Sequence, residues 1–448
     1  MALSGLDIYK QLPKTNCKDC GLPTCLAFAM KVATKQVGLE ACPHVSADAA
    51  AALESASRPP IQLVTIGEGE AEIKVGNETQ LFRHEEKFHR PTAVAVRISD
   101  LDDEQAITDR AAAIGRLAFE RVGRQIRVNL VAVDNESGDA AKLENAVKRA
   151  AEASGLACVV MSAKAENLRR AAAALSGRRP LLYMTDPAEA EAAAAVAKDE
   201  NCPLAVRADG LEALAELSSK LAVLGVEQLV LDPGTRGLKP TLEALTAMRR
   251  LALKNFRALG YPALAMTAGD DPTMQVVEGC TYVAKYAAVL VTDASEPWQI
   301  LPILTARQDI YTDPQKPVAV EPRLYSVGAV DGDSPVLVTT NFSLSYYSVE
   351  SEVEASRVPA HIIAVDTEGT SVLTAWASDK FNAETITKAL RQSGLEERIS
   401  HKKLVIPGFV AVLSAGVEDE SGWGVEIGPK EAAGLPNYLK KQQWNRPA

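Results

Sequence analysis

The sequence predicts an α/β protein made of an N-terminal cysteine-rich module, a central (β/α)8 TIM-type barrel and a small C-terminal α/β domain. Three observations lead to this class. Four of the seven cysteines fall within the first 42 residues. Eight apolar runs in the middle of the chain each precede an amphipathic stretch, and the last part carries loops rich in Gly, Thr and Ser. A chain of 448 residues has room for about three domains.

Composition narrows the class of protein. With 47% apolar residues, 24% charged residues and a net charge of −10, the chain is typical of a soluble globular protein. This charge repels phosphate backbones and anionic lipid, so we expect no nucleic-acid and no membrane partner. The first residues lack the pattern of a secretory signal, and no run approaches the roughly 20 apolar residues of a membrane span. We therefore expect a cytoplasmic protein with reduced thiols.

The sharpest signal is the spacing C-x2-C-x4-C-x16-C, followed by proline, at Cys17, Cys20, Cys25 and Cys42. Four thiolates in one short segment can close around one inorganic centre, which supplies folding energy that a small module lacks. Three clustered cysteines with a remote fourth before proline are typical of a [4Fe-4S] cluster. A structural zinc site is the main alternative. Such a site usually takes two closely spaced pairs of ligands, and the second half of this motif offers only Cys42 and His44. A thioredoxin-like pair would need a preceding strand, and a disulfide framework does not suit the compartment.

Residues 1–57 are predicted to form this cluster domain. Thr24 is a suitable N-cap for a helix that runs to about Val37, which places Cys25 in a first turn where the helix dipole favours anionic sulfur. Residues 58–92 are predicted as a linker that contains one hairpin, EIKV-GNET-QLF. His84 and His89 are expected at the surface of this strip. The remaining cysteines, Cys158, Cys202 and Cys280, are expected to be small buried hydrophobic residues.

Residues 93–312 repeat one unit, an apolar run followed by an Ala-, Glu- and Arg-rich amphipathic stretch. Continuous apolar strands indicate a parallel sheet buried on both faces, and eight regular βα units favour closure into a barrel over an open doubly wound sheet. The predicted strands begin near residues 93, 126, 157, 180, 203, 228, 262 and 288.

A ring of polar residues should follow these strands, at the end of the barrel where TIM-barrel active sites lie. Such a ring can bind a pterin or perform acid–base chemistry, but Asp and Thr at these positions are also ordinary helix N-caps. We favour the capping interpretation and assign no catalytic residue. The members are Asp134, Asn135, Thr185, Asp186, Arg207, Asp209, Asp232, Asp270, Asp271, Thr292 and Asp293.

A Pro-rich stretch after Asp309 marks a second boundary, and residues 320–448 are predicted as the small α/β domain. Its expected strands are Val336 to Thr340, His361 to Asp366, Leu404 to Ile406 and Val410 to Leu413. Its expected helices are Ser343 to Ser356, Val372 to Ala377, Ala383 to Ser393 and Lys430 to Lys440. The loops TTNFS, DTEGTS, IPGF and GPKEAAGLP suit close approach of backbone N–H groups to a large ligand, although plain turns can look the same.

Taken together, these elements resemble one family along essentially the whole chain. The segments TNCKDCGLPTCLAFA and DTEGTSVLTAW are similar to those of the large (gamma) subunits of corrinoid iron–sulfur proteins, which serve the acetyl-CoA decarbonylase/synthase system in the reductive acetyl-CoA pathway. The resemblance implies a [4Fe-4S] cluster on the four cysteines already selected. It also implies a corrinoid (cobalamin-type) on the C-terminal domain, contacted by Thr340, Tyr346, Gly369, Thr370, Ser371, Val372, Leu373, Thr374 and Ala433.

The sequence lacks the D-x-H-x-x-G motif whose histidine coordinates cobalt in many corrinoid proteins, because Asp366 is followed by Thr367 and Glu368. A base-off corrinoid without a histidine ligand is therefore expected. Removing a strong axial donor makes the nucleophilic Co(I) state easier to reach. His361 and His401 precede strands and should lie at the opposite end of the sheet.

The resemblance implies a methyl carrier rather than a stand-alone catalyst. The cobalt would accept a methyl group from methyltetrahydrofolate through a methyltransferase and deliver it to acetyl-CoA synthase/CO dehydrogenase, while the cluster returns Co(II) to Co(I). Expected partners are a small subunit that completes a heterodimer, these enzymes and an electron donor such as ferredoxin. Two alternatives stay open: a pterin-dependent methyltransferase acting through its own barrel, and an electron-transfer subunit with a cluster but no corrinoid.

Overall fold

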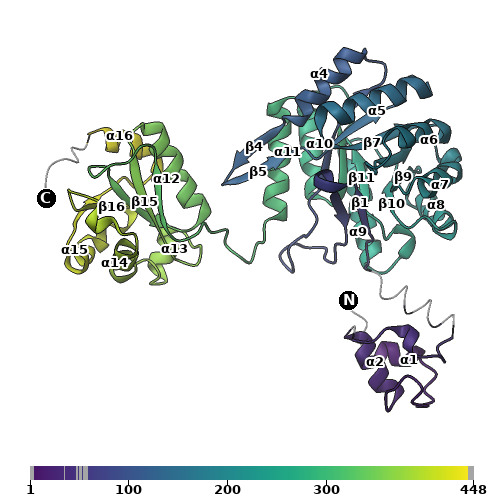
Figure 1. The fold of residues 1–448 in the computed structure, drawn as a ribbon, viewed down its shortest axis with the longest axis horizontal. Helices are drawn as coiled ribbons and strands as arrows, with labels where there is room; N and C mark the ends of the chain where they lie inside the picture. The colour runs from purple at the N-terminus through teal and green to yellow at the C-terminus, as the bar shows by residue number, and fades with distance from the viewer. Residues whose placement is uncertain (1–4, 35, 47–48, 50–52, 54–58, 442–448) are drawn as a thin grey trace. The chain divides into compact units, whose positions relative to one another are not determined.

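The computed structural model describes residues 5–34, 36–46, 49, 53 and 59–441 (Figure 1). The chain divides into two compact units, residues 1–119 with 126–312, and residues 120–125 with 313–448. The predicted division into a cluster domain, a linker, a barrel and a C-terminal domain stays a prediction. Residue 58 of the predicted linker lies outside the described residues.

The N-terminal module has a small core built by two helices and a turn. Helix α2 begins at Cys25 because the Thr24 side chain accepts a hydrogen bond from the Ala27 backbone N–H, which confirms the predicted N-cap. The helix ends earlier than predicted, because the Thr34 hydroxyl bonds the carbonyls of Met30 and Lys31. The elements are α1 (Gly5–Gln11), α2 (Cys25–Ala33) and η1 (Leu39–Ala41).

The central region is a closed barrel of eight parallel strands, as the sequence predicts, in the order β10-β11-β12-β3-β6-β7-β8-β9. Its strands are apolar on both faces. Val94, Val96 and Ile98 of β3 pack against the surrounding helices, whereas Ala93 and Ala95 face the interior. The strands are β3 (Ala93–Ser99), β6 (Leu130–Asp134), β7 (Ala157–Ser162), β8 (Leu181–Met184), β9 (Leu204–Arg207), β10 (Leu229–Asp232), β11 (Ala263–Met266) and β12 (Ala287–Thr292).

Helices follow the strands and cover the outside of the barrel (Figure 1). They are α4 (Glu104–Gly115), α5 (Ala140–Ser154), α6 (Ala165–Ala174), η3 (Pro187–Glu189), α7 (Ala190–Asp199), α8 (Leu211–Val223), α9 (Leu238–Leu253), η4 (Arg257–Leu259), α10 (Pro272–Ala284) and α11 (Pro297–Tyr311).

Two small two-stranded sheets differ from the sequence prediction. The EIKV segment does form a strand, β2 (Ile73–Gly76), but it pairs with β1 (Leu63–Ile66) rather than with QLF. The physical reason is burial: Val64, Ile66 and Val75 pack onto the interior strand residues, closing the end of the barrel where the strands begin. The second two-stranded sheet, formed by β4 (Ala118–Arg121) and β5 (Arg124–Arg127), precedes β6 and was not predicted.

The C-terminal unit holds a five-stranded sheet in the order β13-β15-β14-β16-β17. All neighbours are parallel except β13 with β15. Its strands are β13 (Leu324–Val327), β14 (Val336–Thr340), β15 (Ala360–Val365), β16 (Lys403–Ile406) and β17 (Gly424–Ile427). Its helices are α12 (Ser343–Ser356), α13 (Val372–Ala377), α14 (Ala383–Gln392), η5 (Leu395–Glu397), η6 (Gly408–Leu413), α15 (Ser414–Ser421), η7 (Ala432–Gly434) and α16 (Leu435–Lys441).

The predicted strand at Val410 to Leu413 is wrong, because this run forms the 3-10 helix η6. Val410 is buried, whereas Val412 is 73% exposed, and so short an apolar run does not distinguish a strand from a helix. The strands β13 and β17 were not predicted, since β13 is only partly apolar and β17 is half-exposed.

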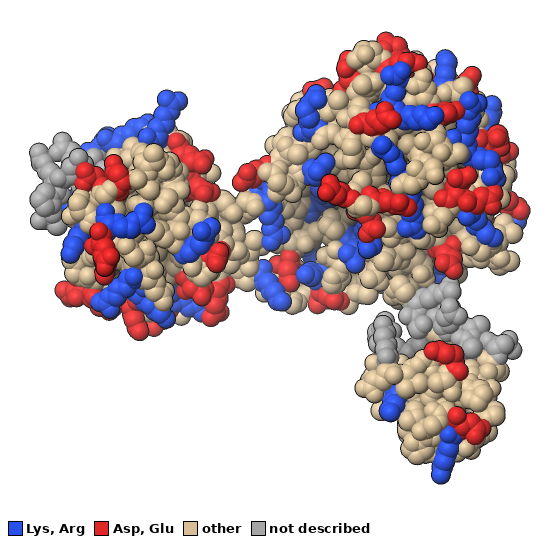
Figure 2. Space-filling view, in the orientation of Figure 1, with Lys and Arg blue, Asp and Glu red and all other residues tan. Residues whose placement is uncertain are grey.

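The described surface is mixed in charge. On the visible face, Lys and Arg side chains alternate with Asp and Glu side chains (Figure 2). Within the described part of the chain, every helix is too short or too polar to cross a lipid bilayer.

Candidate functional site: a cysteine loop, a C-terminal cavity and a barrel mouth

The cysteine loop wraps tightly around the start of α2. Cys25 and Cys42 are buried, and Cys20 packs against the same small core. Asn16 fixes Cys25 from both sides, since its Oδ1 accepts from the Cys25 backbone N–H at 2.8 Å and its own N–H points at the Cys25 sulfur at 3.4 Å. N–H donors aimed at sulfur are a normal feature of iron–sulfur sites.

Left-handed backbone in this loop explains how it turns so sharply. Lys14, Asn16 and Lys18 have φ values of 60°, 50° and 71°, and Gly21 has 76°. Such conformations turn successive N–H groups toward one side and create a concavity for an anion. The loop therefore suits a negatively charged thiolate centre.

Cys17, the first cysteine of the motif, is exposed and lies beside Asp19 and His44. One ligand atom of each of the three residues lies within 4.8 Å of the others. His44 Nε2 lies 2.6 Å from Asp19 Oδ2, and hydrogen bonds from His44 and then Cys17 lower the pKa of Asp19. Sequence reasoning considered His44 only as a zinc ligand and missed its pairing with Asp19. This grouping is the geometric basis of the zinc alternative.

The C-terminal unit holds an open cavity of about 340 Å³ at the carboxyl ends of β14 and β16. In the order β15-β14-β16-β17 the chain continues on opposite sides of β14, so the cavity lies where the strand order reverses. Ligands of open α/β sheets bind at this position. The lining residues are Leu337, Val338, Thr339, Leu344, Ser345, Ser348, Val349, Ser371, Val372, Leu373, Val405, Ile406, Pro407, Phe409, Gly428, Pro429, Lys430, Glu431, Ala432 and Leu435.

Three of the predicted corrinoid contacts, Ser371, Val372 and Leu373, line this cavity. Thr374 is exposed one turn along α13, with its hydroxyl 3.0 Å from that of Ser371. Ala433 lies in η7, directly after the lining residue Ala432.

The other predicted contacts lie apart from the lining. Tyr346 is buried against Tyr325 and Tyr347, and its hydroxyl donates to Glu350 at 2.7 Å. Thr340 is fully buried, and its hydroxyl has no partner among the described residues. Gly369 and Thr370 lie in the loop that leads into α13. The predicted ligand loops IPGF and GPKEAAGLP supply further lining residues, among them Phe409. Leu344 was missed, and it becomes recognisable only once the strand order is known.

None of the five histidines of the chain lines this cavity. His361 lies near the start of β15, with its Nδ1 3.2 Å from the Ser326 hydroxyl, and His401 precedes β16 with its Nε2 3.1 Å from the Ser334 carbonyl. Both are buried at the amino ends of their strands, as the sequence predicts.

Burial, reinforced by Arg398, lowers the pKa of His361. The unfolded chain then binds a proton more readily than the folded one, so stability is fully present above about pH 6.5 and declines as the pH falls through that value. We expect His361→Gln to reduce the loss of melting temperature between about pH 7.5 and about pH 5.5. Scanning calorimetry at both values checks this, with His84→Gln, at an exposed position, as control. An unchanged pH dependence in His361→Gln would contradict the assignment.

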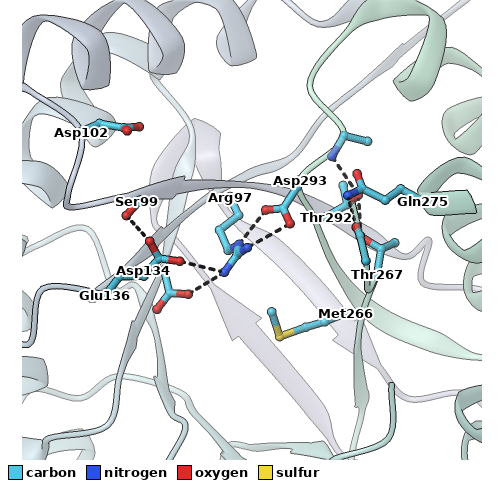
Figure 3. A network of polar contacts seen from close by, with 12 residues as sticks. Arg97, Ser99, Asp102, Asp134, Glu136, Met266, Thr267, Gln275, Thr292 and Asp293 are labelled. Carbon is cyan, nitrogen blue, oxygen red and sulfur yellow. Dashed lines mark hydrogen bonds and ion pairs between the residues drawn. The ribbon is translucent and has the colours of Figure 1, made fainter. Parts of the chain in front are cut away.

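The mouth of the barrel carries a network of ion pairs centred on Arg97 (Figure 3). The guanidinium binds Asp293 through two contacts of 2.6 and 2.9 Å and reaches Asp134 at 2.9 Å and Glu136 at 3.4 Å. The Asp293 hydrogen bond raises the pKa of Arg97, so the guanidinium stays charged. Burial raises the pKa of Asp134 despite this pairing.

The predicted ring at this mouth divides into two kinds of residue. Asp186 and Asp271 cap the helices that follow, in line with the capping interpretation. Asp232 is fully buried, accepts from the Tyr183 hydroxyl and binds Arg236 at 2.8 Å. Other ring members, such as Asn135 and Thr292, are held by side-chain hydrogen bonds. A small cavity at the mouth is lined by Ala163, Thr185, Asp186, Pro187, Arg207, Ala208 and Asp209.

Two family models match the chain. Residues 63–439 match the family model for the CO dehydrogenase/acetyl-CoA synthase delta subunit, and residues 12–44 match one described as a putative Fe-S cluster. Among solved structures, the chain is similar to dihydropteroate synthase from Xanthomonas albilineans in complex with 7,8-dihydropteroate. That likeness has a TM-score of 0.40 and 15% identity over 52% of this chain and 99% of the other, and it carries no argument about function.

Two curated relatives cover the chain almost completely. The corrinoid/iron-sulfur protein large subunit of Moorella thermoacetica is 46% identical over 98% of this chain and 99% of its own. The acetyl-CoA decarbonylase/synthase complex subunit gamma of Methanothermobacter thermautotrophicus is 36% identical over the same shares. The chain therefore belongs to the CO dehydrogenase/acetyl-CoA synthase delta subunit family, among the corrinoid/iron-sulfur protein large subunits and acetyl-CoA decarbonylase/synthase gamma subunits that its sequence resembles.

Proposed function

We propose that this protein is a methyl-group carrier subunit that binds a corrinoid in its C-terminal cavity and a [4Fe-4S] cluster on its cysteine loop. The observation that carries the proposal is the cavity at the switch point of the C-terminal sheet. It occurs in the same chain as a loop of closely spaced cysteines. The Moorella thermoacetica relative is named for a corrinoid and an iron–sulfur group together.

The cysteine loop fits a cluster better than zinc. Cys20, Cys25 and Cys42 share one core, and the left-handed loop around Asn16 aims an N–H group at sulfur. We propose Cys17, Cys20, Cys25 and Cys42 as the ligands, with Cys17 moving from Asp19 to complete the set. When bound, such a cluster supplies single electrons, here to return oxidised cobalt to its active state.

The cavity fits the face of a large, mostly apolar macrocycle. Its wall combines the apolar side chains of Val338, Val405 and Ile406 with hydroxyls such as Ser371, the usual composition of a cofactor site. Because no histidine lines it, we propose a base-off corrinoid without a protein imidazole ligand. When bound, its cobalt accepts a methyl group from methyltetrahydrofolate, through a methyltransferase, for delivery to acetyl-CoA synthase.

The partners follow from this role. Exposed apolar residues at the cavity, Leu344, Leu373 and Phe409, give a second protein an apolar rim to cover. We propose that a small subunit covers this face as the other half of a heterodimer. The methyltransferase, the acetyl-CoA synthase/CO dehydrogenase and an electron donor such as ferredoxin bind in turn. We also propose a cytoplasmic location, where the thiols stay reduced.

Metal analysis tests the proposal first. We expect about four iron atoms and about one cobalt atom per complex when the protein is isolated anaerobically with its partner subunit. The EPR spectrum of the Co(II) form should lack nitrogen superhyperfine splitting, because no imidazole reaches the cavity. Iron without cobalt would instead indicate an electron-transfer subunit, and zinc in place of iron would overturn the cluster assignment. Methylation of free cobalamin without any methyltransferase would favour the barrel as the catalyst.

A further inference from the structure

The loop between β15 and α13 is held by one buried side chain, that of Asn341. This asparagine follows the last residue of β14 and is 3% exposed. Its Oδ1 accepts hydrogen bonds from the Thr367 backbone N–H, the Thr367 hydroxyl and the Gly369 backbone N–H, each at 3.0 Å. Its Nδ2 donates to Asp366 at 3.3 Å. Its side chain thus contacts the loop across residues 366–369.

The Asn341 main chain is held as firmly as its side chain. Its N–H donates to the Val365 carbonyl, and its carbonyl accepts from the Val320 N–H, both at 2.8 Å. The side chain therefore projects from a backbone fixed to both neighbouring segments. A buried amide with this many partners has little freedom to move.

The loop that Asn341 holds is under backbone strain. Glu368 adopts φ = 54° and is not glycine, and Gly369 follows with φ = 73°. A Cβ on Gly369 would come within 2.9 Å of the Pro317 side chain, so the loop is also pressed against a neighbouring segment. Such conformations persist when surrounding contacts determine them.

What the loop positions is one wall of the cavity. Residues Ser371, Val372 and Leu373 follow it directly and line the cavity, whereas Asn341 itself does not. We infer that Asn341 is a positioning residue for the corrinoid site: it fixes the loop of residues 366–370 and thereby sets the wall formed by residues 371–373. This inference deepens the proposed function and rests on it.

The test compares full-length variants isolated with the partner subunit, using cob(II)alamin as the probe. We expect Asn341→Ala to weaken cob(II)alamin binding by about tenfold or more, the size expected when several buried hydrogen bonds that set one wall are lost. Amide hydrogen exchange across residues 366–373 should become faster in this variant. Iron content should stay at the wild-type value, because the cysteine loop is untouched.

The chain offers a matched control in Asn135, a buried asparagine of the barrel. Its amide bonds Asp100, Ser162 and Asn167, so Asn135→Ala removes a comparable set of hydrogen bonds. We expect this variant to lose stability while its cob(II)alamin affinity stays within about twofold of wild type. Should Asn341→Ala fail to fold, Thr367→Val removes the hydroxyl that Asn341 and the Thr370 carbonyl share and is expected to weaken binding by about threefold.

The possible outcomes distinguish a failure of the positioning role of Asn341 from a failure of the proposed corrinoid binding. Weaker binding and faster loop exchange in Asn341→Ala and Thr367→Val, but not in Asn135→Ala, support the positioning role. Wild-type affinity in both loop variants overturns it and leaves the corrinoid proposal standing. Absence of cob(II)alamin binding in the wild-type complex overturns the proposed function, and the inference falls with it.

Discussion

Replacing Cys25 with serine is expected to remove the iron from the protein. Cys25 is 7% exposed, begins α2 and contacts Asn16 through both its backbone N–H and its sulfur, so the loop holds this sulfur in one place. With the proposed [4Fe-4S] cluster on the four cysteines, iron should fall from about four atoms per chain to near zero. The module should also lose its fold, because its core is small and the metal supplies much of the folding energy.

Two measurements check this result. Iron per chain gives the occupancy, and limited proteolysis followed by mass spectrometry shows whether residues 5–46 become cleavable while residues 93–312 stay resistant. The matched control is Cys280→Ser, since Cys280 is a half-buried free cysteine in α10 with no metal-ligating neighbour described. This control should keep its iron and its resistance to protease.

A second variant separates the two metal sites that the geometry allows. His44→Ala removes the imidazole that lies beside Cys17 and Asp19 but leaves all four cysteines in place. With a cluster on the cysteines, this variant should retain its iron. A wild-type protein that contains zinc, loses it in His44→Ala and keeps it in Cys25→Ser would contradict the cluster assignment.

The barrel could be read from the sequence because its signal is redundant. Eight strands repeat the same apolar pattern, so the assignment survived an error of four residues at the start of one strand, which was predicted near Ile126 although β6 begins at Leu130. The partner of the EIKV strand was not predictable in this way, because β1 owes its place to burial of Val64 and Ile66 against the barrel interior. Contacts of that kind depend on the closed fold and leave little trace in local sequence.

The two candidate sites also differ in how far the sequence predicts them. The cysteines are close in sequence, and their spacing alone carries the chemistry. The cavity is assembled from β14, β16, α12, α13 and the segment after β17. The loop composition indicated DTEGTS, IPGF and GPKEAAGLP, and the resemblance indicated Ser371, Val372 and Leu373 as individual contacts. Asn341 was missed because its role appears only when the end of β14 lies beside the loop after β15. Its sequence context, TTNFS, indicated a loop suited to a ligand but gave no sign that the asparagine side chain would hold another loop.

Introducing a negative charge at Leu373 is expected to weaken corrinoid binding strongly without unfolding the protein. Leu373 lines the cavity yet is 47% exposed, so Leu373→Asp places a carboxylate at an apolar wall but leaves the core untouched. Desolvating that charge against the macrocycle costs about 2 kcal/mol or more, which corresponds to a loss of affinity of about 30-fold or more. Stability should change by less than about 0.5 kcal/mol, as at other exposed positions.

The control uses the same substitution elsewhere in the same unit. Val412 is 73% exposed and does not line the cavity, so Val412→Asp adds an equal charge without touching the wall. Cob(II)alamin titration and calorimetry of the full-length complex should separate the pair, with Leu373→Asp binding much more weakly and Val412→Asp binding like wild type. Equal binding by both variants would move the corrinoid away from the start of α13. Equal loss in both would mean that net charge, rather than contact with this wall, governs binding, because the two variants differ only in where the carboxylate lies.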